Sequence, residues 1–91
     1  MSAELELARQ AAKLGAIFMK ADDSDVIGLA DELLLFLNRL QDLIKQNAKL
    51  QIPLSSIDDI IYGLESNPDL TLQDKDIRTR LLKIFAKLAL L

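Results

Sequence analysis

The sequence has no cysteine and no histidine, and it has few glycine, proline or aromatic residues. Without cysteine there are no disulfides, thiol nucleophiles or thiolate metal ligands, and without histidine there is no imidazole base or ligand. Three glycines and two prolines in 91 residues leave little material for a turn-rich fold. These absences close most routes to catalysis. We therefore expect a protein that is not an enzyme and that holds no cofactor and no metal.

The residues that are present favour helices. Apolar residues make up 51% of the chain and 20 of them are leucine, whereas there is one valine and there are two threonines. That composition is typical of helix rather than strand. A chain of this length forms one domain, residues 1–91, and buries only a little over ~60% of its unfolded surface. The apolar fraction therefore predicts a homodimer, and the alternative is a monomer whose surplus leucines lie exposed as on any protein surface.

Apolar periodicity predicts four helices and hence an all-α fold. We expect them at residues 3–20, from just after Ser24 to about Asn47, at 56–66, and from Thr71 onward. The expected N-terminal caps are Ser2, a residue of the 22–24 segment, Ser55 or Ser56, and Thr71, which has Asp74 three residues later. The expected architecture is a small four-helix bundle with a long central second helix and a short third helix, and dimerisation is one way to complete it.

The second helix has apolar residues on more than one side, most densely from Leu33 to Leu37. Core packing is one interpretation. The other is that the surplus meets a second copy, because the third helix is too short to cover the second along its whole length. The chain also ends in an apolar run that must pack on something. The candidate dimer interface is therefore Ile27, Leu34, Leu35, Leu90 and Leu91.

Charge is distributed unevenly along a chain of net charge −3. Residues 22–76 carry 12 acids and four bases, whereas residues 77–91 carry no acid and four bases, which are Arg78, Arg80, Lys83 and Lys87. This basic last helix is the candidate partner-binding face. It has three interpretations: solvated pairing with acids of neighbouring helices (such as Asp31, Glu32 and Asp42), docking on an acidic partner, or contact with an anionic membrane surface.

Motifs for specific chemistry fail on their spacing. A calcium loop started at Asp23 would place Ile27 and Leu34 where oxygen ligands are required. Asp58 and Asp59 are adjacent on a helix, so their side chains diverge instead of forming an acid–base pair. No phosphate-binding glycine motif is present. A helix-turn-helix would offer acidic residues at the start of its recognition helix, so nucleic-acid binding is disfavoured.

An acidic four-helix chain of about 90 residues with a charged last helix also resembles the bacteriocin immunity proteins. The resemblance spans the whole chain but concerns layout only, so no functional position is transferred from that family. No basic segment followed by an apolar one opens the sequence, and we expect a cytoplasmic protein. The preferred hypothesis is a non-enzymatic, homodimeric helical module that binds an unknown protein. The alternative is an immunity-like or membrane-surface protein, and the third is a small regulatory nucleic-acid-binding protein.

Overall fold

The structure is a computed structural model that describes residues 3–20, 25, 28–46 and 52–90. Within these ranges the chain is all-α, with no strand. The helices that have defined bounds there are α1 Ala3–Lys20, α3 Ala30–Gln46, α4 Leu54–Ser66, α5 Pro68–Gln73 and α6 Lys75–Ala89. The all-α prediction is confirmed.

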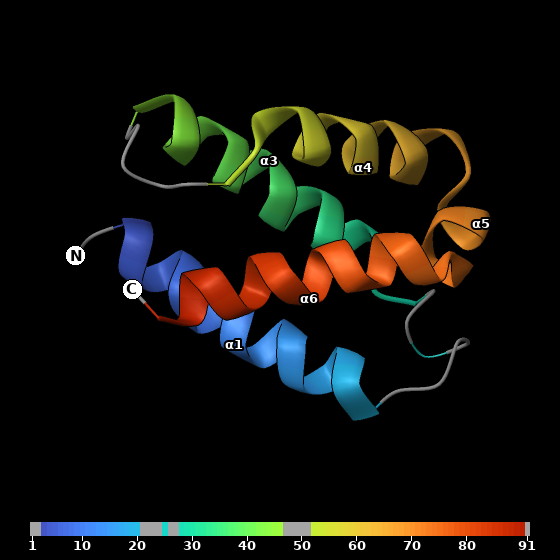
Figure 1. The fold of residues 1–91 in the computed structure, drawn as a ribbon, viewed down its shortest axis with the longest axis horizontal. Helices are drawn as coiled ribbons and strands as arrows, with labels where there is room; N and C mark the ends of the chain where they lie inside the picture. The colour runs from blue at the N-terminus through green and yellow to red at the C-terminus, as the bar shows by residue number, and fades with distance from the viewer. Residues whose placement is uncertain (1–2, 21–24, 26–27, 47–51, 91) are drawn as a thin grey trace.

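The helices pack as two antiparallel pairs that lie on one another. The first and last helices, α1 and α6, form one pair, and α3 and α4 form the other (Figure 1). The short helix α5 connects α4 to α6 and reverses the direction of the chain between them. The start of α1 and the end of α6 therefore lie at the same end of the molecule (Figure 1). This arrangement leaves two seams between the pairs, one between α1 and α3 and one between α4 and α6.

Apolar side chains from all five helices fill the space between the pairs. The ring of Phe85 on α6 lies at its centre and meets two other rings edge-on. Its centroid is 5.5 Å from that of Phe18 and 5.5 Å from that of Phe36, at interplanar angles of 78° and 66°. Aromatic pairs favour this geometry because the positive ring edge faces the negative ring face. Phe85 thus joins α6 to α1 and α3 at one point.

The second predicted helix is shorter than expected at its start. The structure has a turn at Gly28 and Leu29, and α3 begins at Ala30. Glycine is a poor helix former, whereas Asp31 and Glu32 suit the positive end of the helix dipole, so the later start is physically favoured. Most of the apolar run is core, since Leu33 and Leu37 are fully buried. The caps predicted at 22–24 and the helix end at Asn47 lie outside the described residues.

The predicted start of the third helix is wrong by two residues. The helix α4 begins at Leu54, so Ser55 and Ser56 lie inside its first turn and do not cap it. Pro53 occupies the N-cap position with φ −63° and ψ 119°, and it provides no side-chain hydrogen bond. Proline has its φ fixed near this value, so the ring sets the direction in which the chain enters the helix.

The predicted fourth helix is in fact two helices. Thr71 lies inside α5. Asp74 separates α5 from α6, because its ψ of 120° is not helical. The carboxylate of Asp74 accepts hydrogen bonds from the backbone N–H of Asp76 at 2.8 Å and of Ile77 at 3.4 Å. Asn67, expected only to end the third helix, also caps α5 by accepting from Leu70 N–H at 3.3 Å. The missed signal is an N-cap asparagine followed by proline at the first helical position.

Candidate functional site

Of the predicted dimer residues, Leu34, Leu35 and Leu90 lie in the described part of the chain, and these three do not share one exposed surface. Ile27 and Leu91 lie outside the described residues. Leu34 is half-buried against the core. Leu35 on α3 and Leu90 just after α6 are 56% and 87% exposed, but they belong to different helix pairs. An interface made from this set stays a prediction, and among its described members Leu35 and Leu90 are the exposed ones.

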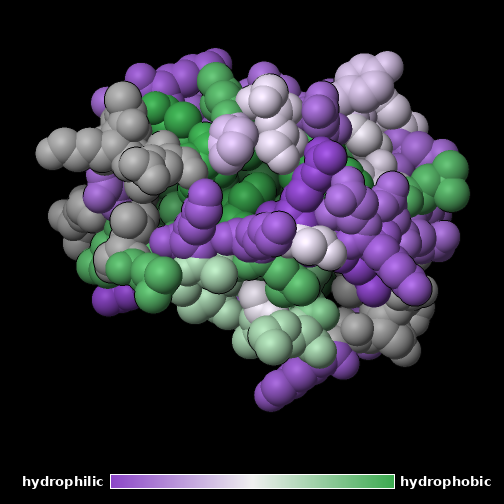
Figure 2. All heavy atoms as spheres, in the orientation of Figure 1, coloured by the Kyte–Doolittle hydropathy of each residue, from purple (hydrophilic) through white to green (hydrophobic). Residues whose placement is uncertain are grey.

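A broader apolar surface covers the outer side of the α1–α6 pair. Helical spacing places its members on adjoining sides of the two helices, because residues three, four and seven apart share a side. We call it the α1–α6 face, and its apolar members are Leu5, Ala12, Ala16, Met19, Leu82 and Ala89, with exposed Arg9 on the same side of α1 and Leu90 following at the end of α6. Met19 is 79% exposed and Leu5 is 46% exposed. Figure 2 shows green and pale-green side chains gathered along α1 and the adjoining edge of α6.

The α1–α6 face was not predicted, although its residues were visible in the sequence. In the sequence, Ala12 and Met19 directly follow Ala11 and Phe18, so their positions also fit a side of the first helix that packs inside the protein. The structure uses only some of the small residues of this helix in this way: Ala8 is buried, and a Cβ added to Gly15 would lie 3.4 Å from Phe85 Cβ. Ala12 and Met19 face outward. Periodicity identifies an apolar side of a helix but does not say how much of that side the fold covers.

The four bases of α6 separate into one structural residue and one row. Arg78 is half-buried, and its Nε donates to the carbonyl oxygen of Leu72 at 2.8 Å, which ties α6 to α5. Arg80, Lys83 and Lys87 lie on another side of α6 and are exposed. Arg80 Nη2 lies 3.1 Å from Asp76 Oδ2, one turn earlier in the same helix. Arg80 therefore pairs within its own helix and not with the neighbouring acids that the sequence suggested.

The basic row borders an apolar groove between α4 and α6, which we call the α4–α6 groove. It has a volume of about 370 Å³ and is lined by Ile52, Pro53, Ser56, Arg80, Lys83, Ile84, Ala86 and Lys87. Ile52 and Ile84 form its floor and are each 6% exposed. In Figure 2 it appears as a green hollow between the purple row on α6 and the side chains of α4. None of the described residues that line it is an acid.

The start of α4 adds to the positive character of the α4–α6 groove. The first N–H groups of any helix have no partner inside the helix, and the helix dipole makes this end positive. Pro53 and Ser56, from the first turn of α4, both line the groove. This site was not predicted, because residues 49–54 lie in the connection between two predicted helices. The signal was there in the apolar Ile52 directly before a proline.

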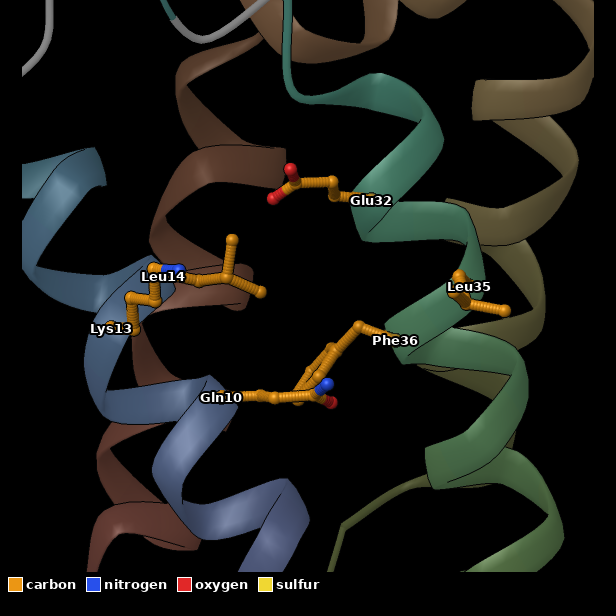
Figure 3. Close-up of a pocket in the computed structure, with 6 residues that line it drawn as sticks. All are labelled: Gln10, Lys13, Leu14, Glu32, Leu35 and Phe36. Carbon is orange, nitrogen blue, oxygen red and sulfur yellow. The ribbon is translucent and has the colours of Figure 1, made fainter.

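The seam between α1 and α3 has a different character. Two hollows of about 250 and 310 Å³ lie along it and share Gln10. Figure 3 shows Gln10 from α1 and Glu32 and Phe36 from α3 projecting into the first hollow. Bases and acids both line the seam, including Lys13 beside Glu32 and Arg39 beside Asp42. Two bases and three acids line the two hollows, so both signs are present and no ligand of one sign is indicated.

The buried residues in the described part of the chain are all apolar, and no group of three or more possible metal ligands comes together there. None of its helices is long and apolar enough to cross a membrane. Comparison of the chain with protein-family models, with curated proteins and with solved structures gives no match in any of the three. Function must therefore be inferred from the two surfaces and the seam just described.

Proposed function

We propose that this chain is a non-enzymatic helical module of the cytoplasm that acts by binding other protein chains, and that it works as a homodimer. One observation carries the dimer: exposed apolar residues of α1 and α6 gather on the outer side of this helix pair, with Arg9 beside them. A contiguous apolar patch of this kind marks a surface that another molecule covers. In this proposal the subunit is a four-helix bundle, and a second copy completes it.

The size of the α1–α6 face supports a second copy as its occupant. With 18 and 15 residues, α1 and α6 are about 27 and 22 Å long at 1.5 Å per residue. Two adjacent helices, each about 10 Å across, offer roughly 500 Å² per copy, or about 1,000 Å² in a dimer. That area reaches the lower bound of specific interfaces.

The composition of the α1–α6 face suits packing of helix against helix. Its centre contains small residues, Ala12, Ala16 and Ala89, which let backbones approach closely, and its edges carry Leu5, Met19 and Leu90. A two-fold axis would place the same patch on both sides, so each large side chain meets the small residues of the other copy. Burying Met19 alone in this way contributes about 1.5–3 kcal/mol before the entropy of association is subtracted.

Sedimentation velocity at about 50 µM tests this proposal. The fraction of the chain that is dimeric depends on its concentration and on the dissociation constant. We expect a species of twice the 10.2 kDa chain mass. Met19→Glu would bury a charge at the proposed contact and should weaken the dimer by roughly 100-fold or more, giving a helical monomer. Leu35→Glu is the matched control, since Leu35 is also exposed but lies on α3.

The outcomes separate the two candidate interfaces. A monomeric wild-type chain at this concentration would contradict the dimer altogether. If Leu35→Glu gives a folded monomer and Met19→Glu does not, the interface lies on α3, as the sequence alone predicted, and the α1–α6 face is not the contact. Far-UV circular dichroism of both variants shows whether either substitution has unfolded the subunit.

A second candidate function is association with a membrane surface, the role suggested by the likeness in layout to immunity proteins. The observation that favours it is the position of Lys83 and Lys87, exposed on the same helix that carries part of the α1–α6 face. Basic residues beside an apolar face are typical of helices that lie on anionic lipid. Co-sedimentation with anionic vesicles at low salt tests it, and binding that Met19→Glu and Lys83→Glu both abolish would favour it over the dimer.

A further inference from the structure

We propose that the α4–α6 groove binds an acidic amphipathic helix of a partner protein, whose apolar side chains enter the groove while its carboxylates meet the basic row. This inference rests on the proposed protein-binding function, and it adds a site and the chemistry of the partner. It does not depend on the dimer, because the α1–α6 face and the groove lie on different sides of α6 (Figure 2).

The shape and floor of the groove indicate an apolar occupant. Its volume of about 370 Å³ falls within the range of ligand-binding sites, ~300–1,000 Å³. Ile52 comes from the segment before α4 and Ile84 from α6, so the floor joins two elements that otherwise meet little along this seam. An amphipathic helix presents side chains of the size that such a groove accepts, spaced three and four residues apart.

The charge on the rim selects the sign of the partner. Arg80, Lys83 and Lys87 line the groove, and none of its described lining residues is an acid, although the chain as a whole is acidic. The positive start of α4 opens into the same groove and adds to the attraction for carboxylates. Arg80 already pairs with Asp76, but both side chains are largely exposed, and such surface pairs exchange partners at little cost.

The length of the basic row matches a helix of about two turns or more. Arg80 and Lys87 are seven residues apart, so the row extends over about 10 Å of α6. Carboxylates seven residues apart on a partner helix have the same spacing. A binding helix therefore needs acids at i and i+7, with leucine-like residues on the adjoining side, roughly 100° round the helix, at i+1, i+5 and i+8.

Other anionic ligands fit the groove less well. A nucleic acid would be held by phosphate contacts and by bases stacked on aromatic rings, and no aromatic residue lines this groove. Its concave apolar floor likewise suits a ridge of side chains better than the surface of a bilayer.

A designed peptide pair tests the proposal directly. The probe is a fluorescein-labelled 16-residue helix with leucines on one side and glutamates beside them, and its control has lysine in place of every glutamate. We expect the acidic peptide to bind the wild-type protein in fluorescence anisotropy and the basic peptide to bind at least about tenfold more weakly. Equal binding of both peptides, or no binding of the acidic peptide, would overturn the proposal.

Variants of the protein locate the binding. Lys83→Glu should weaken binding of the acidic peptide about tenfold, because it replaces an electrostatic attraction with a repulsion. Lys13→Glu makes the same change of charge on the α1–α3 seam and should alter affinity less than twofold. Ala86→Trp, which fills the groove without changing its charge, should also abolish binding. Retained binding in both Lys83→Glu and Ala86→Trp would place the peptide elsewhere and refute the assignment.

Two further arms separate the other ligand classes and the dimer. If anionic vesicles or a 15-nucleotide single strand bind wild-type protein and lose binding with Lys83→Glu, while the acidic peptide does not bind, the groove takes phosphates and the proposal is wrong. Peptide binding by Met19→Glu, the expected monomer, should equal that of the wild type. Loss of the dimer with intact peptide binding, or the reverse, shows which of the two proposals has failed.

Discussion

The close approach of α4 and α5 at Gly63 gives a sharp quantitative prediction. A Cβ atom added to Gly63 would lie 2.7 Å from Thr71 Oγ1 and 3.0 Å from Thr71 Cγ2, which is closer than side chains pack. The two helices are held there by hydrogen bonds from Asn67 N–H to the carbonyl of Gly63, at 2.8 Å, and from Thr71 N–H to the carbonyl of Asn67, at 3.1 Å. Gly63→Ala therefore forces Thr71 or the α4–α5 corner to move.

The expected magnitude combines two opposing terms. Replacing glycine by alanine inside a helix stabilises it by about 1 kcal/mol, whereas overpacking costs about 1–3 kcal/mol. The net effect of Gly63→Ala is a loss of about 1 kcal/mol, or a fall in Tm of about 4–8 °C for a domain of this size. Gly15→Ala is the matched control. Its added Cβ would lie 3.4 Å from Phe85 Cβ, an ordinary contact, so this variant should gain about 0.5–1 kcal/mol.

Urea unfolding followed by circular dichroism measures both changes, and a double-mutant cycle isolates the clash. Thr71→Ala removes Oγ1 and Cγ2 and leaves Cβ at 3.4 Å from the new atom. In that background Gly63→Ala should stabilise the protein, giving a coupling of about 2 kcal/mol between the two sites. If Gly63→Ala stabilises the wild-type chain as much as Gly15→Ala does, the close approach of α4 and α5 is not a constraint and the reasoning fails.

Three further substitutions test the packing of α5, the cap of α6 and the ring contacts at the centre of the core. Leu72→Ala should cost about 2–5 kcal/mol in urea unfolding, because Leu72 is fully buried and anchors α5, and a loss below 1 kcal/mol would show that α5 contributes no core. Asp74→Ala should cost about 1 kcal/mol by removing the cap of α6, whereas Asp74→Asn, which keeps an acceptor, should cost much less in the same assay. Phe85→Leu should lose about 1–3 kcal/mol in thermal unfolding, since it removes the ring contacts to Phe18 and Phe36; an unchanged Tm would contradict its central position.

Apolar periodicity predicted the helices that are long enough to show it. The first helix has the predicted bounds of residues 3–20, and the predicted stripe of the third, Ile57, Ile60, Ile61 and Leu64, is buried in full. The spacing of Arg80, Lys83 and Lys87 predicted one shared side, and these three residues line one groove. Local spacing suffices for such statements because a helix repeats every 3.6 residues.

The remaining features depend on contacts between distant parts of the chain. A helix of six residues such as α5 is too short to display a period, so Pro68–Gln73 merged with the helix that follows. Arg78 was predicted as one more surface base, because its carbonyl partner, Leu72, lies in α5, a helix that the sequence pattern did not reveal. The α1–α6 face and the α4–α6 groove are spaces that the other helices leave uncovered. Whether a given side of a helix is covered is settled only when the helices assemble.

The pairing of α1 with α6 has a consequence for how the chain acquires its structure. Of the described helices α1 is synthesised before the others, and it packs mainly against α6, across more than fifty intervening residues. During translation α1 therefore has an uncovered apolar side until α6 has emerged, and only the α3–α4 pair can form early from neighbouring segments. A nascent chain that stalls before Lys75 would expose Leu7, Leu14 and Phe18 to the surrounding proteins. The closing step of folding is thus also the step that hides the side chains most prone to aggregate.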